Sequence, residues 1–297
     1  YRLADGQLIE TVAIPDGDRL TLCISSQAGC ALQCAFCATG AMGFQRNLTP
    51  AEIAGQVREL RMLEPPLLAT NIVFMGMGEP LMNWKAVDVT LTLLNDPRAL
   101  GIGARHITIS TVGILPGIVA LSQRPEQFRL AISVHAPSDA LRHTLMPVNT
   151  KYPLADVIAA ARDFDRRVTF EYVMLGGVND QPEHAAQLAQ LARDCKAFVN
   201  LIPLHPGGSM GFTPTSGAVI ASFARALRGA QPCDVFTLQP YRPRRRAQLA
   251  RQQVEVGRLT GAVGPDDAGP APRRQRQVDA MHAAVITGLM PLATAAV

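Results

Sequence analysis

Short β-branched runs alternate with segments of helical period along most of the chain, and this order restricts the fold more than any other property of the sequence. The runs with the length of buried strands cover residues 20–26, 71–75, 106–111, 130–135, 168–174 and 198–204. The segments of helical period cover residues 51–62, 84–94, 154–162, 183–195 and 217–227. This βαβα order predicts an α/β protein with parallel strands covered by helices.

Two architectures fit six parallel strands: an open doubly wound sheet, or an incomplete barrel of the TIM type. Periodicity does not separate them. Thr49, Pro50 and Glu52 predict a capping box with proline in the first turn of the first helix. Neither an internal repeat nor a glycine-rich dinucleotide fingerprint is visible in the sequence.

Composition favours a cytoplasmic protein. Charged residues interrupt every apolar stretch well before the length of about 20 residues that a transmembrane helix requires. The chain of 297 residues starts at Tyr1, and no basic segment precedes an apolar run, so we expect no signal peptide. Six cysteines are too few for a disulfide scaffold, and three of them lie within eight positions, which indicates ligands in a reducing compartment.

The net charge of +4 is small, but arginines gather in one segment. This basic run consists of Arg242, Arg244, Arg245, Arg246 and Arg251. Its charge suits a phosphate backbone, and a solvated surface accounts for it equally well.

Three cysteines form the most specific motif. Cys30, Cys34 and Cys37 have C-x3-C-x2-C spacing in the loop after the first predicted strand. Three thiolates bind three irons of a [4Fe-4S] cluster and leave the fourth iron open for the amino and carboxylate groups of S-adenosylmethionine (SAM). Structural zinc is the alternative, but zinc prefers four ligands, and no matching fourth ligand lies nearby. Cys195 and Cys233 are isolated, and we expect them to fill the core.

Further motifs accompany the cysteines at residues 23–30, 38–48, 76–83, 109–113, 131–137, 171–175 and 199–203. Over residues 7–230 they resemble, in unbroken order, the RlmN and Cfr group of radical-SAM RNA methyltransferases, which methylate adenine at C2 or C8. The resemblance implies a partial (βα)6 barrel with SAM bound across the carboxyl ends of the strands. We therefore divide the chain into a short N-terminal β extension (1–19), the barrel (20–257) and a weakly ordered tail (258–297).

The resemblance also implies roles for individual residues. Positions that contact SAM correspond to Gly78, Glu79, Ser110, Ser133, Val134 and His135. Glu10 matches a glutamate proposed as a proton acceptor, and Cys23 matches the thiol that resolves the methylated intermediate. Taken alone, Ser110 and His135 are ordinary satisfied polar residues and Glu10 is a surface carboxylate.

Three departures from the family pattern bear on function. The family usually carries an additional N-terminal helical domain used in RNA binding, and we expect this chain to begin after it. His205 stands where the family has an asparagine near SAM, although imidazole can still donate and accept hydrogen bonds. The family segment whose cysteine carries the methyl group corresponds to residues 241–251, and no cysteine follows Cys233.

These features predict a radical-SAM enzyme of the adenine-C2 methyltransferase type with a [4Fe-4S] cluster and SAM as cofactors. The family implies 23S ribosomal RNA, and in some members tRNA, as substrate, and an electron donor such as flavodoxin or ferredoxin. Because the acceptor thiol is missing, we expect SAM cleavage without methyl transfer by the family route. The alternatives are a radical-SAM paralogue that modifies a small molecule or peptide, and a non-catalytic module that binds metal or RNA.

Overall fold

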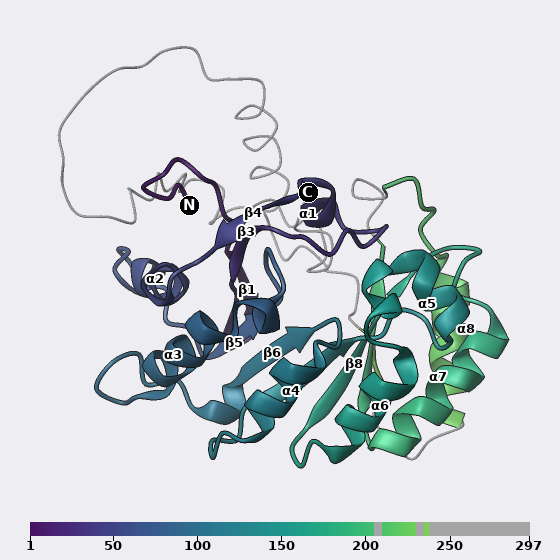
Figure 1. Ribbon diagram of the computed structural model, residues 1–297. Coiled ribbons are helices and arrows are strands. Elements are labelled where there is room, and N and C mark those ends of the chain that lie inside the picture. Colours follow the sequence, from purple (N-terminus) through teal and green to yellow (C-terminus); the bar gives the residue numbers. More distant parts are fainter. Residues whose placement is uncertain (205–209, 230–234, 238–297) are drawn as a thin grey trace.

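An eight-stranded sheet forms the centre of the protein (Figure 1). The computed structural model describes residues 1–204, 210–229 and 235–237. Across the sheet the strands are β1 (Val12–Asp16), β2 (Arg19–Cys23), β5 (Asn71–Phe74), β6 (Ile107–Thr111), β7 (Arg129–Ser133), β8 (Val168–Met174), β9 (Phe198–Pro203) and β10 (Val235–Thr237). β1 pairs antiparallel with β2, and every pair from β2 to β10 is parallel.

The strand order decides between the two architectures that the sequence left open. From β2 to β10 each strand pairs with the next strand along the chain, apart from the separate β3–β4 pair. A doubly wound sheet instead reverses its strand order at a switch point. Right-handed crossovers that all run in one direction place the helices on one face, and the sheet curls into part of a barrel. The predicted partial barrel is therefore confirmed, with β10 as a seventh parallel strand.

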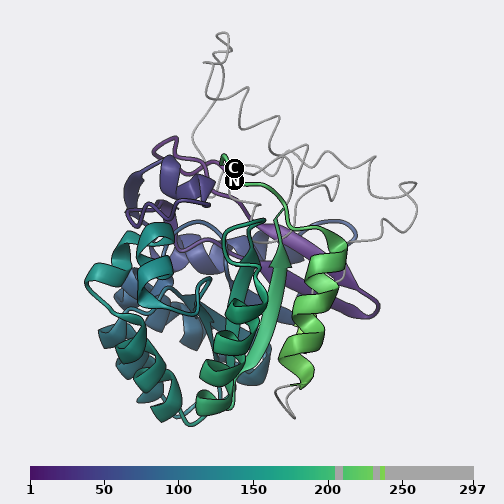
Figure 2. The same ribbon diagram turned by 90° about the vertical axis from the view of Figure 1, so that its right-hand side faces the viewer.

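Helices follow the strands and form the outer layer. They are α2 (Pro50–Arg61), α3 (Trp84–Asn95), α4 (Leu115–Ser122), α5 (Asp139–Leu145), α6 (Leu154–Asp163), α7 (Pro182–Cys195) and α8 (Gly217–Gly229), with the 3-10 turns η1 (Pro80–Asn83), η2 (Ala104–His106) and η3 (Pro147–Thr150). Along this layer α2 contacts α3, α4 contacts α6, α6 contacts α7, and α7 contacts α8. Figure 2 shows the helices of the C-terminal half beside the strands. The five predicted helices and the predicted capping box of Thr49 and Glu52 are confirmed.

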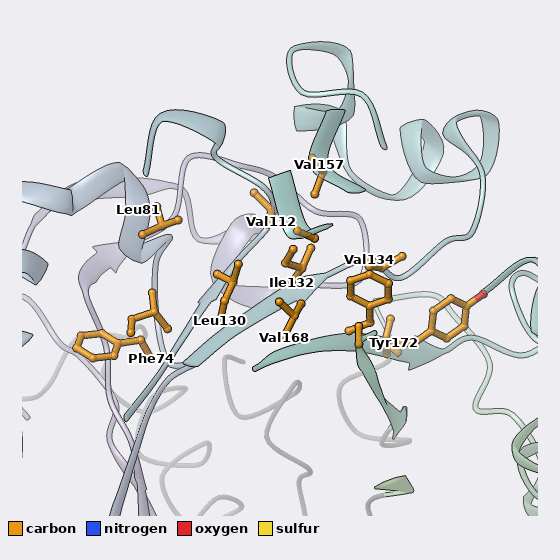
Figure 3. Close-up of a cluster of buried hydrophobic side chains, with 14 of the residues drawn as sticks. Phe74, Leu81, Val112, Leu130, Ile132, Val134, Val157, Val168 and Tyr172 are labelled. Atoms are coloured by element: carbon orange, nitrogen blue, oxygen red, sulfur yellow. The ribbon is translucent and has the colours of Figure 1, made fainter. Parts of the chain in front are cut away.

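The main core lies between the sheet and this helical layer. Leu130 and Ile132 of β7 are completely buried and point to the same face, because side chains alternate along a strand. Figure 3 shows Val157 of α6 above Ile132 and Val112. The side chains that alternate with these along each strand point to the opposite, concave face of the sheet.

A small hairpin follows β2 and departs from the predicted strand at residues 20–26. β2 ends at Cys23, and the chain then enters β3 (Gln27–Gly29), which pairs antiparallel with β4 (Phe44–Asn47). The short helix α1 (Ala38–Ala41) lies between them. The predicted strand at 20–26 is therefore too long, because only residues 20–23 lie in β2 and residues 24–26 form the connection to β3.

The N-terminal segment packs onto the barrel through Leu3 and Ile9, which are buried. None of the described helices combines the length and the apolar character needed to cross a membrane. Several sequence expectations lie outside the described residues: His205, Cys233, the basic run and the tail at 258–297.

Candidate functional site

The cysteine loop, residues 30–43, connects the two strands of the hairpin. The amide of Cys30 donates to the carbonyl of Gly43 at 3.1 Å. Gly29 has a φ of 75°, and a Cβ at this position would lie 1.9 Å from the Gly43 oxygen, so glycine is required here. On the other side, the amide of Ala35 donates to the carbonyl of Leu145 at the end of α5, at 2.8 Å. The loop is therefore fixed both to its own hairpin and to the barrel.

The loop holds three free thiols close together. Cys30 is buried, whereas Cys34 and Cys37 are half-buried. Burial raises the pKa of all three, that of Cys30 to about 11, and thiol neighbours raise the pKa of Cys30 and Cys34 further. Without a bound cation the loop keeps its thiols protonated, and metal coordination removes these protons.

The donor set of the loop fits an iron–sulfur cluster. In the described part of the chain, no group of three or more His, Cys, Asp and Glu side chains is spaced to hold a single metal ion. Three thiols in one loop are the ligands that a [4Fe-4S] cluster with one open iron requires.

Glu79 is buried beside this loop, and both of its carboxylate oxygens accept backbone hydrogen bonds. Oε1 accepts from the amide of Leu81 at 3.1 Å, and Oε2 accepts from the amide of Val112 at 2.9 Å. Burial raises the pKa of Glu79 to about 7. The carboxylate thus connects the loop after β5 to the end of β6, where the side chain of Thr111 also hydrogen-bonds to it.

Two glycines bring the loop after β5 close to the chain itself. Gly78 has a φ of 96°, and a Cβ there would lie 2.4 Å from the Cβ of Gln27. A Cβ at Gly76 would lie 2.8 Å from the carbonyl oxygen of Ile24. The close approach that these glycines permit is therefore to Ile24, just after β2, and to Gln27, the first residue of β3, and the predicted contact of Gly78 with SAM stays a prediction.

His135 joins the end of β7 to the cysteine loop. It leaves the strand with a φ of 54°, and its ring packs edge-on against Phe36 of the loop, with centroids 4.7 Å apart. Nδ1 accepts a hydrogen bond from the amide of Val173 at 3.0 Å, so the neutral ring carries its proton on Nε2. Burial, and then the charge of Arg142, lower the pKa of His135 to about 3. The imidazole is therefore a neutral donor.

The concave face of the sheet gathers polar side chains that come from four neighbouring strands. Ser110 of β6 pairs with Ala131 of β7, and two residues later Ser133 pairs with Glu171 of β8. Asn200 of β9 pairs with Glu171 and donates from Nδ2 to its Oε2 at 2.7 Å. Sequence analysis missed Glu171 as a site residue, because its motif at 171–175 reads as a strand.

Glu10 and Cys23 lie near each other. Glu10 precedes β1, and Cys23 is the last residue of β2 and pairs with Val12, the first residue of β1. The carbonyl of Glu10 accepts from the hydroxyl of Ser25 at 2.6 Å. Burial raises the pKa of Glu10 to about 7, and its buried Oε2 has no hydrogen-bond partner among the described residues. Burial raises the pKa of Cys23 to about 12, and the charge of Glu10 also contributes. A carboxylate of this kind can accept a proton near neutral pH.

Replacing Glu10 with glutamine increases the free energy of unfolding above pH 7 and changes it little at pH 5. Burial raises the folded pKa from 4.5 to about 7, so the stabilisation of the neutral acid is complete below pH 4.5 and is lost as the pH rises from there through 7. We expect a gain of about 1–2 kcal/mol at pH 8.5, reduced by solvent screening of this partly exposed group. Urea unfolding at both pH values measures it, with the exposed Glu183→Gln as control. A gain of equal size at pH 5 would contradict the explanation.

Arg142 is the other residue that sequence analysis missed. It lies on α5 and is 0% exposed. Its Nε donates to the carbonyl of Val134, itself buried, at 3.3 Å. No periodicity or spacing marks a single arginine, so only the tertiary structure reveals its position.

Comparison with known proteins assigns this geometry to a class. Residues 24–189 match the model of the radical SAM superfamily, a range that includes the cysteine loop, Glu79, Ser110, Ser133 and His135. The chain is therefore a member of the radical SAM superfamily. This superfamily uses a [4Fe-4S] cluster and SAM, so the two predicted cofactors are confirmed at the level of the family.

Individual relatives show to which family within the superfamily the chain belongs. The chain is 86% identical over 228 residues to a probable dual-specificity RNA methyltransferase RlmN from Gemmatimonas aurantiaca, covering 77% of this chain and 63% of that protein. It is 44% identical over 278 residues to a dual-specificity RNA methyltransferase RlmN from Anaeromyxobacter dehalogenans, covering 84% and 74%. A crystal structure of a radical SAM methyltransferase from Sphaerobacter thermophilus matches with a TM-score of 0.74 at 45% identity, covering 80% and 71%. The chain belongs to the RlmN family.

Proposed function

We propose that this chain binds a [4Fe-4S] cluster through Cys30, Cys34 and Cys37 and cleaves SAM reductively. The observation that carries this proposal is the group of three free thiols in one fixed loop next to the carboxyl ends of parallel strands. The chain spans 63% of the length of its 86% identical relative, so the activity is a proposal for this chain in its own right. The bound cluster supplies the electron that breaks a carbon–sulfur bond of SAM.

The pocket for SAM lies on the concave face between the cysteine loop and the ends of β5 to β8. Its proposed lining consists of Gly78, Glu79, Ser110, Ser133, Val134 and His135. Glu79 offers a carboxylate oxygen to the ammonium of SAM, and the neutral His135 offers a donor at Nε2. His205 is a further proposed contact, from the segment outside the described residues.

We infer that the substrate is RNA, because the relatives bear the name of RNA methyltransferases. Adenine C2 of 23S ribosomal RNA or tRNA is the proposed target, with Glu10 as the proton acceptor and Cys23 as the resolving thiol. A low-potential electron donor such as flavodoxin or ferredoxin and a cytoplasmic location complete the proposal. The sequence has no cysteine after Cys233, so we expect no methyl transfer by the family route.

One experiment tests both parts of the proposal, the cleavage of SAM and the absence of methyl transfer to RNA. Anaerobically reconstituted protein is incubated with methyl-labelled SAM, dithionite and a fragment of 23S ribosomal RNA. We expect 5'-deoxyadenosine without labelled 2-methyladenosine in the digested RNA. Labelled 2-methyladenosine would show that Cys23 or Cys233 acts as a displaced methyl carrier. Absence of 5'-deoxyadenosine from a fully loaded sample would overturn the proposed cleavage.

A further inference from the structure

Arg142 is a buried cation that makes no direct ion pair among the described residues, and Asp139 reaches it only through Asn149. Its side chain is 0% exposed, and it makes no ion pair with any of the described acidic side chains. Neutral oxygens surround it instead. Its guanidinium donates to the side-chain oxygen of Asn149 at 2.7 Å and to the carbonyls of Val112, Ser133, Val134 and Tyr152.

These bonds hold the charge of Arg142 at the carboxyl ends of two central strands. Val112 follows β6 and Ser133 ends β7. A guanidinium that donates to several elements at once cannot turn away from its site without leaving buried carbonyls unpaired. The position of the charge is therefore fixed by the fold.

The same helix that carries Arg142 also holds the cysteine loop. Leu145, at the last turn of α5, accepts the hydrogen bond from the amide of Ala35, which follows Cys34 directly. Arg142 also donates to the carbonyl of Val134, next to His135, whose ring packs against Phe36 of the cysteine loop. In this buried setting the charge of Arg142 is screened far less than it would be at the surface.

We propose that Arg142 is a positioning residue that raises the reduction potential of the cluster on the cysteine loop. This inference rests on the proposed function. Reduction by one electron adds a negative charge to the cluster, and a fixed positive charge nearby stabilises that state. His135, whose ring packs against Phe36 of the loop, is neutral because burial and then the charge of Arg142 lower its pKa to about 3, so Glu79 is the acidic group beside the loop.

The test is a redox titration of reconstituted protein with dithionite and mediators, without SAM, followed by electron paramagnetic resonance. Arg142→Gln removes the charge, and we expect a roughly tenfold lower equilibrium constant for reduction, equal to about 59 mV for a one-electron couple. Arg142→Lys keeps the charge with fewer hydrogen bonds, and we expect most of the potential to be retained. Arg166→Gln is the matched control, because Arg166 also donates to four carbonyls, those of Leu121, Ser122, Arg124 and Glu126.

The variants distinguish charge from structure. An unchanged potential in Arg142→Gln, or equal shifts in Arg142→Gln and Arg142→Lys, would overturn the inference while leaving the proposed function intact. Failure of the wild-type protein to bind iron would instead overturn the proposed function. If Arg142→Gln does not load, Asp139→Asn decides, because it removes the negative charge that acts on Arg142 and keeps the Oδ1 that accepts from Asn149 and Leu154. A higher potential in that variant supports the inference, and an unchanged one contradicts it.

Discussion

Replacement of Cys34 by alanine abolishes both cluster binding and SAM cleavage. Each of the three thiols in the cysteine loop is the proposed ligand of one iron, and alanine offers no donor atom in its place. Cys30→Ala and Cys37→Ala have the same effect. The measurements are iron and sulfide content with visible absorption after anaerobic reconstitution, and 5'-deoxyadenosine formed from SAM and dithionite.

Cys195→Ala provides the matched control. This cysteine is also buried, but it lies at the end of α7, where its thiol donates to the carbonyl of Ile158 at 3.4 Å. We expect normal iron content and normal SAM cleavage in this variant. Full iron content in Cys34→Ala, or loss of the cluster in Cys195→Ala, would show that the ligands have been assigned to the wrong thiols.

Replacement of Glu79 by alanine weakens SAM binding and destabilises the fold at the same time. The buried amides of Leu81 and Val112 lose their acceptor, which costs about 2–4 kcal/mol of unfolding free energy. The loss of a charge-assisted hydrogen bond to the ammonium of SAM weakens binding by about 1–3 kcal/mol. Urea unfolding and titration of the reconstituted protein with SAM measure the two effects separately.

Glu79→Gln separates the two roles further. A glutamine keeps one acceptor oxygen but presents an NH2 group to the second amide, so we expect about half of the stability loss. The negative charge that attracts the ammonium is also gone, so SAM binding should fall nearly as far as in Glu79→Ala. Unchanged SAM affinity in both variants would remove Glu79 from the pocket and leave it a purely structural residue.

Much of the barrel could be predicted because its strands and longer helices carry strong local signals. The run at 168–174 coincides with β8, and the segment at 84–94 differs from α3 by a single residue. The helix α4 lacks such a signal, because it is apolar on all sides and contains Pro116 and Gly117. Strand order depends on pairing between distant segments, so only the structure decided between the open sheet and the barrel.

The candidate site also contains some features that the sequence predicts and others that only the structure reveals. The spacing of the cysteines and the strand-end positions of Ser110 and Ser133 are local properties, and the sequence contains them. The double role of Glu79 depends on an amide at Val112, which belongs to a different loop. Arg142 and Glu171 are recognisable only from their burial and their partners, because a single charged residue in a helix or strand carries no periodic signal.

The hydrogen bond between Ala35 and Leu145 affects how the cysteine loop becomes ordered during synthesis of the protein on the ribosome. The cysteine motif emerges early, but the helix that fixes it is synthesised far later in the chain. A nascent chain that ends before α5 has its three thiols without the partner that orients their loop. We therefore expect the proposed cluster to be inserted only after β2, β5, β6, β7 and α5 have assembled, and the thiols to be open to oxidation until then.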